Sequence, residues 1–366
     1  YRQGLHWYAI ILTLFCYTIA MLGTSLYQKY RPAVFKDVLG QDHIVKVLQG
    51  ALKEGNAAHA YLFVGTRGTG KTSVARILAR ELGAKDADIH EIDAATYTGV
   101  DNIRALREEA AVMPFESEKK VYIVDEVHML SKGAFNAFLK LLEEPPSHVA
   151  FILATTELEK VPETIQSRCQ VFTFKRPTQK VLIEMVTRVA KAEGYTLEPA
   201  SAELISLLAD GSFRDGHSIL QKILASSSDK KVSVEEVVNV TGAPKMELVH
   251  RVIETLAKGE AKGALTAVGE AGKANADMGV FVMLLIQRVR IILMLRYAPD
   301  FGKELMEGLT DTDQTSLDGF SKDAASKINS ETLRKIILAS IETPRSPVPE
   351  LPLELAIMEL SAIKSE

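Results

Sequence analysis

The residues best suited to chemistry follow an apolar stretch near the start of the chain. Ala60–Val64 has the composition of a buried strand, and the next residues have the spacing Gly-x4-Gly-Lys-Thr. Glycines allow backbone turns in which several N–H groups converge on phosphate oxygens, and the helix expected from Ser73 to Leu82 adds its dipole. Lys71 suits the β- and γ-phosphates and Thr72 suits Mg²⁺. The pattern predicts a nucleoside triphosphate site formed by Gly65, Thr66, Arg67, Gly68, Thr69, Gly70, Lys71, Thr72 and Ser73. The alternative is a glycine-rich turn with an incidental lysine.

A second apolar stretch ends in two adjacent carboxylates. Val121–Val124 has a strand's composition and is followed by Asp125 and Glu126. Mg²⁺ prefers hard oxygen ligands and keeps several waters, which suits Asp125 as an outer ligand of a nucleotide-bound ion. Glu126 is placed to orient and deprotonate an attacking water. A strand end that is acidic without function is the alternative, and the loop at 65–72 favours the catalytic interpretation.

Two hydroxyls end a third predicted strand, which begins at Val149. A polar residue at the carboxyl end of such a strand faces the crevice in which open α/β sheets bind ligands. Thr155 or Thr156 is therefore a candidate sensor of the γ-phosphate or of the attacking water. The high β-propensity of threonine explains both residues equally well.

Two arginines lie at positions from which they could reach a nucleotide. Arg168 precedes the predicted strand Gln170–Phe174 and is either a surface charge or an arginine finger, which stabilises transition-state charge on a neighbour's γ-phosphate. Arg214, in the segment Asp210–Asp215, follows a helical pattern of apolar residues between Ala202 and Leu208. It could reach back to the nucleotide from a helical lid, or form a salt bridge with Asp215 at a helix cap.

These residues need an α/β scaffold, and the chain has the length and composition for one. Its 366 residues are 47% hydrophobic and 25% charged, which is typical of soluble globular domains. The net charge of −4 excludes an overall basic field, so any DNA contact requires a local patch or a partner. The two cysteines, Cys16 and Cys169, exclude a disulfide framework and a four-cysteine zinc site and indicate a reducing compartment.

The strand-and-helix pattern ends near Pro177, and the remainder of the chain is helical. Residues 179–243 predict three helices separated by turns near Gly194 and Ser226–Lys230, and Gly242–Pro244 is a plausible hinge. Helices continue from Met246. The apolar run Gly279–Ile286 is followed by charged residues, which favours a buried helix over a membrane span.

The first residues do not fit a soluble domain. Leu5–Leu22 is nearly all apolar and long enough for a membrane helix, yet the sequence starts with Tyr1, and Met21 lies just before a normal domain start at Ser25. We expect residues 1–24 to be spurious upstream read-through, with a real membrane anchor as the minority interpretation. A cytoplasmic protein without a stable membrane partner is therefore expected.

The motifs in this order resemble the gamma/tau subunit of bacterial DNA polymerase III, the AAA+ motor of the sliding-clamp loader. The resemblance is dense from residue 25 to 243 and looser afterwards. The combination of the segments 125–131, 141–146 and 167–169 is highly specific. The matching segments are Tyr27–Pro32, Phe35–Gln41, Gly65–Thr72, Glu91–Ala95, Asp125–Ser131, Leu141–Pro146, Ala154–Thr156, Ser167–Cys169 and Gly211–Asp215.

The resemblance implies a fold and three domains. An α/β P-loop AAA+ domain, with a parallel sheet flanked by helices, would occupy residues 25–178. A small helical lid would follow at 179–243 and an all-α collar, which mediates oligomerisation, at 244–366. The family's partners would be the delta and delta-prime subunits, further copies of the chain, the sliding clamp and primer-template DNA.

The resemblance also implies residue roles, with ATP and Mg²⁺ as cofactors. Lys71, Thr72, Asp125 and Glu126 would act in cis, Arg214 would be the second sensor, and Arg168 would act on ATP bound by the adjacent subunit. The residues that would border the adenine are Arg31, Pro32, Val38 and Leu39.

Two departures from the family pattern carry expectations. The family's four-cysteine zinc module is absent, because only Glu81–His90 bridges the gap in which it is usual, and we expect no structural zinc. Gly216 stands where alanine is usual and would loosen the lid helix by up to about 1 kcal/mol.

Three alternatives to the clamp-loader motor remain open from the sequence. Another AAA+ machine, such as a branch-migration helicase or an archaeal-type loader subunit, has the same catalytic chemistry. A ring member that does not hydrolyse ATP is disfavoured by the intact Lys71, Thr72 and Glu126. A membrane-anchored AAA+ protein depends wholly on residues 5–22.

Overall fold

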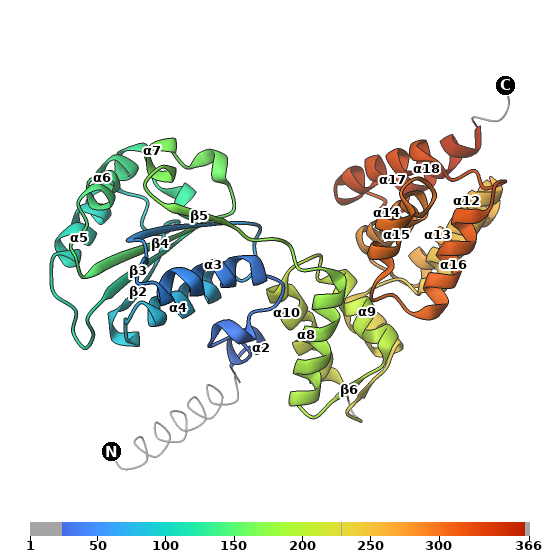
Figure 1. Ribbon diagram of the computed structural model, residues 1–366. Coiled ribbons are helices and arrows are strands. Elements are labelled where there is room, and N and C mark those ends of the chain that lie inside the picture. Colours follow the sequence, from blue (N-terminus) through green and yellow to red (C-terminus); the bar gives the residue numbers. More distant parts are fainter. Residues whose placement is uncertain (1–23, 228, 363–366) are drawn as a thin grey trace, which may run out of the picture. The chain divides into compact units, whose positions relative to one another are not determined.

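The computed structural model describes residues 24–227 and 229–362, and these form two compact units that divide between Arg176 and Pro177. Figure 1 shows a sheet with flanking helices in the first unit and helices in the second. The architecture predicted from the sequence, a parallel sheet covered by helices and followed by a helical region, is confirmed. The predicted read-through segment lies almost wholly in residues 1–23, outside the described residues.

The first unit is built on a five-stranded parallel sheet in the order β2-β3-β4-β1-β5. Its strands are β1 Ala60–Val64, β2 Ile89–Asp93, β3 Lys120–Asp125, β4 Val149–Thr155 and β5 Gln170–Thr173. Its helices are α2 Leu26–Lys29, η1 Phe35–Asp37, α3 Asp42–Lys53, α4 Lys71–Glu81, η2 Asp86–Asp88, α5 Val100–Ala110, η3 Val127–Met129, α6 Lys132–Glu143, η4 Leu158–Lys160 and α7 Glu163–Gln166.

Successive side chains of the interior strands β1, β3 and β4 enter two separate cores, because a strand alternates its faces. In β1, Leu62 packs with α5 and α6 on one face, whereas Tyr61 and Phe63 pack with α3 and α4 on the other. Figure 1 shows these helix pairs on opposite faces of the sheet. The strands β1 and β4 are buried along their whole length, as expected for interior strands of a parallel sheet covered on both faces.

The second unit is helical apart from a short parallel pair of strands. Its first part contains α8 Gln179–Ala192, β6 Thr196–Leu197, α9 Pro199–Leu208, α10 Phe213–Ser226, β7 Lys231–Val232 and α11 Val234–Thr241. Its second part contains α12 Met246–Lys258, α13 Ala261–Lys273, α14 Met278–Tyr297, α15 Pro299–Met306, α16 Asp311–Lys322, α17 Ser330–Glu342, η5 Thr343–Arg345 and α18 Leu351–Ala362. The further division near residue 243 into a lid and a collar stays a prediction.

The prediction of three helices between residues 179 and 243 is wrong. The described part of that segment contains four, because the chain breaks at Asp210 and Gly211, whose φ angles are 42° and 73°. A non-glycine residue rarely adopts a positive φ, and aspartate is among those that do so most readily. The sequence predicts turns only near Gly194 and Ser226–Lys230, whereas a further turn separates α9, which ends at Leu208, from α10, which begins at Phe213.

The helix α14 is the core of the second unit. Most of its length is apolar and buried, including Phe281, Leu285 and Val289. Among the described residues it is the one helix long and apolar enough to cross a membrane, yet 61% of its apolar window is buried inside the protein. A helix that is apolar on all sides and covered by its neighbours is a core helix, so the expectation of a buried helix here is confirmed.

A buried ion cluster joins α14 to three other helices of this unit. The Arg288 side chain is 1% exposed, and its Nη2 donates to Glu203 Oε1 at 2.6 Å and to Asp313 Oδ2 at 2.5 Å. His250 Nε2 lies 3.2 Å from Asp313 Oδ1, and the Thr310 N–H donates to Glu203 Oε2 at 2.6 Å. Burial raises the pKa of Glu203 despite the nearby Arg288 charge. Burial acts in the same direction on Asp313, but the contacts with His250 and Arg288 outweigh it and lower the pKa of Asp313.

We predict that Arg288→Met lowers the free energy of unfolding of the second unit by about 3 to 5 kcal/mol, because two buried carboxylates lose their counter-ion. Urea unfolding followed by circular dichroism measures the change. The matched control is Arg290→Met on the same helix, since Arg290 is exposed and lies 5.9 Å from the ring of Phe301. Equal losses in the two variants would contradict a specific contribution of the cluster.

We predict that Gly216→Ala stabilises α10 by about 0.5 to 1 kcal/mol, because alanine has the higher helix propensity. An added Cβ would lie 3.0 Å from Met185 Cε, the end of a flexible side chain that can shift. Gly269→Ala in α13 is the control, since nothing lies within 4 Å of its added Cβ. Thermal unfolding compares the stability of the two variants. A lower stability of Gly216→Ala together with a higher stability of Gly269→Ala would show that the Met185 side chain cannot move aside.

Candidate functional site

The predicted phosphate-binding loop joins the carboxyl end of β1 to the amino end of α4. Gly65, Gly68 and Gly70 all have positive φ, of 156°, 78° and 98°. At Gly65 an added Cβ would lie 2.9 Å from both the Cβ and the carbonyl oxygen of Phe174, so no larger residue fits. Gly70 precedes the first helical residue, and the loop therefore presents its backbone at a helix amino terminus, where phosphate binds favourably.

The Lys71 ammonium group lies inside this loop. Its Nζ donates to the carbonyl oxygens of Gly65 at 2.7 Å and Thr66 at 3.0 Å, and the residue is only 6% exposed. The Thr69 hydroxyl also donates to Thr66 O, at 2.8 Å, which closes the loop on itself. A positive charge is thus held within the loop, as binding of the β- and γ-phosphates requires.

The two predicted magnesium ligands touch each other across the sheet edge. Thr72 Oγ1, in the first turn of α4, donates to Asp125 Oδ2 at 2.9 Å at the end of β3. A hydroxyl and a carboxylate are the hard oxygen groups that Mg²⁺ prefers, directly or through water. The donor set therefore fits a magnesium ion bound together with a triphosphate.

Glu126 follows with a left-handed backbone, φ 50° and ψ 45°. Its N–H donates to Asp125 Oδ1 at 3.0 Å, and its Oε2 accepts from the Thr156 hydroxyl at 3.2 Å. A positive φ is uncommon for a non-glycine residue, and such conformations cluster at functional sites. The predicted base and the predicted sensor Thr156 are thus brought into direct contact.

A histidine to which the sequence analysis assigned no role lies beside this pair. The His128 side chain is 7% exposed, and its Nδ1 lies 3.0 Å from Thr155 Oγ1 and 3.5 Å from Glu126 Oε2. Its Nε2 lies 3.2 Å from Glu157 Oε1. His128 belongs to the segment 125–131 that marks the family, and a histidine three residues after a catalytic aspartate was the available signal.

Gln41 is a second residue without a predicted role, and it holds the base of the phosphate loop. It is fully buried; its Nε2 donates to Lys175 O at 2.7 Å, and its Oε1 accepts from Lys175 N at 3.2 Å. The same Nε2 lies 3.5 Å from Thr69 O. The Gln41 side-chain amide therefore satisfies the hydrogen-bonding groups of the Lys175 backbone, after β5, and also contacts the phosphate loop at Thr69.

Arg168 lies between α7 and β5, as its sequence position predicted. Its side chain is 35% exposed; Nη2 donates to Glu143 Oε1 at 2.7 Å and Nη1 donates to Thr164 O at 2.7 Å. It is therefore a surface arginine paired within its own unit. Action on a neighbour's nucleotide stays a prediction and requires the Glu143 pair to open.

The remaining predicted residues are placed but not tested by this geometry. Arg67 and Ser73 lie in the loop and in the first turn of α4. Arg31, Pro32, Val38 and Leu39 are half-buried near η1, and Arg214 lies in the first turn of α10 in the second unit. Their contacts with a nucleotide stay predictions.

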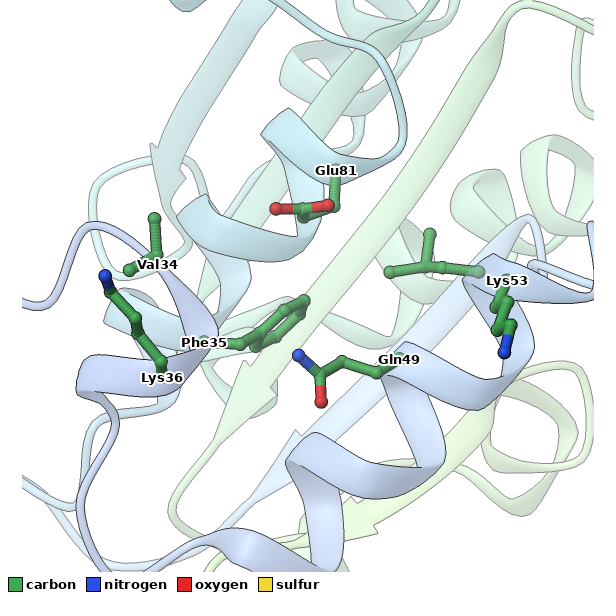
Figure 2. Close-up of a pocket in the computed structure, with 7 residues that line it drawn as sticks. Val34, Phe35, Lys36, Gln49, Lys53 and Glu81 are labelled. Carbon is green, nitrogen blue, oxygen red and sulfur yellow. The ribbon is translucent and has the colours of Figure 1, made fainter.

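A separate pocket of about 560 Å³ lies near η1 but away from the phosphate loop. Figure 2 shows the Phe35 ring at its centre, between Lys36 and Gln49. Glu81 lines it at the last residue of α4, whereas Lys71 is the first. At 1.5 Å per helical residue these ends are about 15 Å apart, so the pocket is not the phosphate site.

The segment that bridges α4 and β2, where the family's zinc module is usual, is a short turn held by Asp88. This carboxylate accepts from the N–H groups of Phe115 and Glu116 at 2.5 and 2.8 Å and from the Ser117 hydroxyl at 2.6 Å. These hydrogen bonds outweigh the effect of burial and lower the pKa of Asp88 to about 2. No group of three metal-ligating side chains occurs within residues 24–227 and 229–362, and the expected absence of zinc stays a prediction.

The fold and the phosphate loop define the class to which the protein belongs. A parallel sheet with a P-loop after β1 and an acidic pair after β3 is the nucleotide-binding arrangement of AAA+ proteins. The branch-migration motor RuvB of Thermotoga maritima shares this fold, with a TM-score of 0.51 and 21% identity over 70% of this chain and 91% of that one.

The sequence comparisons give the family. The chain is 31% identical over 301 residues to the DNA polymerase III subunit gamma of Buchnera aphidicola, over 76% of this chain and 83% of that protein. It is 40% identical over 296 residues to the DNA polymerase III subunit tau of Bacillus subtilis, over 75% of this chain and 52% of that protein. The family described as DNA polymerase III, delta subunit, matches residues 40–95 and 84–178. The chain belongs to the gamma/tau subunits of bacterial DNA polymerase III.

A further relative sets the extent of the match. The gamma/tau subunit of Mycobacterium tuberculosis H37Rv is 34% identical over 363 residues, which are 92% of this chain and 62% of that protein. The chain thus spans about half to three fifths of these longer relatives.

We predict that Gln41→Ala destabilises the first unit by about 1 to 3 kcal/mol, because it leaves the backbone groups of Lys175 without their buried partner. The same change should weaken nucleotide binding, since the amide also contacts the loop. Thermal unfolding and titration with a fluorescent ATP analogue measure the two effects. Gln49→Ala, exposed on the helix α3 that Gln41 precedes, should change neither by more than about 0.5 kcal/mol.

Proposed function

We propose that the chain is the ATP-hydrolysing motor subunit of a bacterial clamp loader, which opens the sliding clamp and loads it on primed DNA. The observation that carries this proposal is the contact of Thr72 with Asp125 beside the pair of Glu126 and Thr156. A magnesium site and a general base then lie together at the end of a P-loop. Membership of the gamma/tau family supports the clamp-loader role.

In the proposed reaction Lys71 and the loop N–H groups bind the β- and γ-phosphates. Thr72 and Asp125 hold the magnesium ion, which supplies charge neutralisation when bound. Glu126 orients a water and accepts its proton, and Thr156 fixes that carboxylate. Arg214 would sense the nucleotide from the second unit.

The site is completed by a second chain in this proposal. Arg168 lies on the surface and is paired with Glu143. It is about a hundred residues from the phosphate loop of its own chain in the sequence. In the assembled ring it would act on ATP bound by the neighbouring subunit. Delta-type and delta-prime-type subunits, further copies of the chain, the clamp and primer-template DNA are the proposed partners, in the cytoplasm.

Other AAA+ machines remain the alternative, because the fold that the chain shares with RuvB does not separate these functions. ATP turnover, measured alone and then with delta-type subunits, clamp and primed DNA, tests the proposal. Low activity alone that rises strongly with the full set supports a clamp-loader motor. Activity that is indifferent to clamp and primer would overturn it in favour of another AAA+ machine.

We predict that Arg168→Ala leaves ATP affinity of the isolated chain within about 2-fold but lowers turnover of the assembled ring by 10-fold or more, of the order that an arginine finger contributes. Lys71→Ala should abolish ATP binding in both states. Arg80→Ala is the matched control, since Arg80 forms an exposed pair with Asp86. Equal losses in the isolated chain and the ring would show that Arg168 acts in cis or is structural.

A further inference from the structure

The His128 imidazole links the predicted base to the chain that follows β4. It lies in η3, directly after Glu126, and contacts Thr155 and Glu157 at the end of the neighbouring strand. With 7% of its side chain exposed, it is nearly closed off from solvent, whereas Glu126 and Glu157 are 33% and 37% exposed. A buried polar ring between two half-exposed carboxylates has little freedom to reorient.

One proton assignment satisfies every group in this contact. The Thr155 hydroxyl donates to Nδ1 over 3.0 Å, Nε2–H donates to Glu157 Oε1 over 3.2 Å, and the Glu157 N–H donates to Thr155 Oγ1 over 3.0 Å. The ring then lies behind the Glu126 carboxylate, with Nδ1 3.5 Å from Oε2, without being its hydrogen-bond donor. The Thr156 hydroxyl donates to the same Oε2.

The segment that holds His128 also leads to Arg168. Thr155, Thr156 and Glu157 are followed by η4, whose last residue Lys160 pairs with Glu157 at 2.7 Å, then by α7 and Arg168. The His128 ring thus contacts both this segment, at Thr155 and Glu157, and the Glu126 carboxylate.

We propose that His128 is a positioning residue that sets the orientation of the Glu126 carboxylate according to the position of the segment 155–168. This inference rests on the proposed ATPase function and deepens it, because it names how the site is regulated. The base is aligned when Glu157 and Thr155 hold the ring in place, and it loses alignment when they move.

The test is ATP turnover by the full chain in its clamp-loader assembly. His128→Phe keeps the ring volume but removes both nitrogens, and it should lower kcat about 10-fold with the KM for ATP within about 2-fold. His128→Asn keeps a polar atom near the Nδ1 position and should stay within about 3-fold of wild type. His148→Phe is the matched control, since His148 contacts Ala110 O in the same unit and should not change kcat.

The same substitution made in a Glu126→Gln variant distinguishes a positioning role of His128 from a general loss of structure. In Glu126→Gln, which removes the base, adding His128→Phe should have no further effect, because residues that act as one unit are not additive. A further 10-fold loss there, a parallel loss of ATP affinity, or an unchanged kcat in His128→Phe would each overturn the inference. If His128→Phe does not fold, Glu157→Gln applies the same test, with a kcat loss expected and an unchanged kcat overturning it. Absence of turnover in the wild-type assembly would instead refute the proposed function.

Discussion

The position of β1 in the interior of a parallel sheet is the constraint on which the site depends. Carboxyl ends of parallel strands meet at one edge, and the register pairs Val64 with Thr155 on one side and with Thr173 on the other. Neighbouring strands are about 4.8 Å apart, so β3 lies roughly 10 Å from β1 with β4 between them. The first turn of α4 spans that gap, which is why Thr72 reaches Asp125 at 2.9 Å.

Much of this arrangement could be predicted from local pattern. Apolar runs that end in glycine or acidic residues locate strand ends, and a P-loop has one structural context. The sequence accordingly predicts that Thr72, Asp125 and Glu126, together with Thr155 or Thr156, lie near one nucleotide. By contrast, Gln41 and His128 contact residues far along the chain, such as Lys175 and Thr155. Such contacts depend on tertiary position, which no local pattern encodes.

The break between α9 and α10 was missed for a different reason. Asp210 and Gly211 stand within an apolar spacing that suits a helix, and periodicity alone reads through them. The positive φ at both residues redirects the chain. An aspartate-glycine pair is a turn signal even inside a periodic segment, and here the turn overrides the helical spacing.

The cluster of Arg288, Glu203 and Asp313 places one buried charge on the otherwise apolar helix α14 and pairs it with carboxylates of two other helices. Burying one arginine and two carboxylates costs desolvation, which their attraction offsets only with close geometry. Glu203 on α9 is thereby tied to α14 and α16. The helices before and after the predicted hinge at 242–244 therefore share one buried contact, and separating them would break the ion pairs that hold Glu203 and Asp313 on Arg288.

The strand order also imposes a sequence of events during synthesis. β1 emerges from the ribosome early, but the strands on both of its sides, β4 and β5, are made last. Roughly 110 residues separate Val64 from Phe174, whose N–H donates to Val64 O, and at about 5 to 20 residues per second their translation takes about 5 to 20 s. Until β4 has been made, both edges of this apolar strand lack their partners, and one edge stays unpaired until β5 follows, which is a hazard for aggregation. The nascent chain therefore completes the sheet edge that holds its nucleotide site only after β5 has been made.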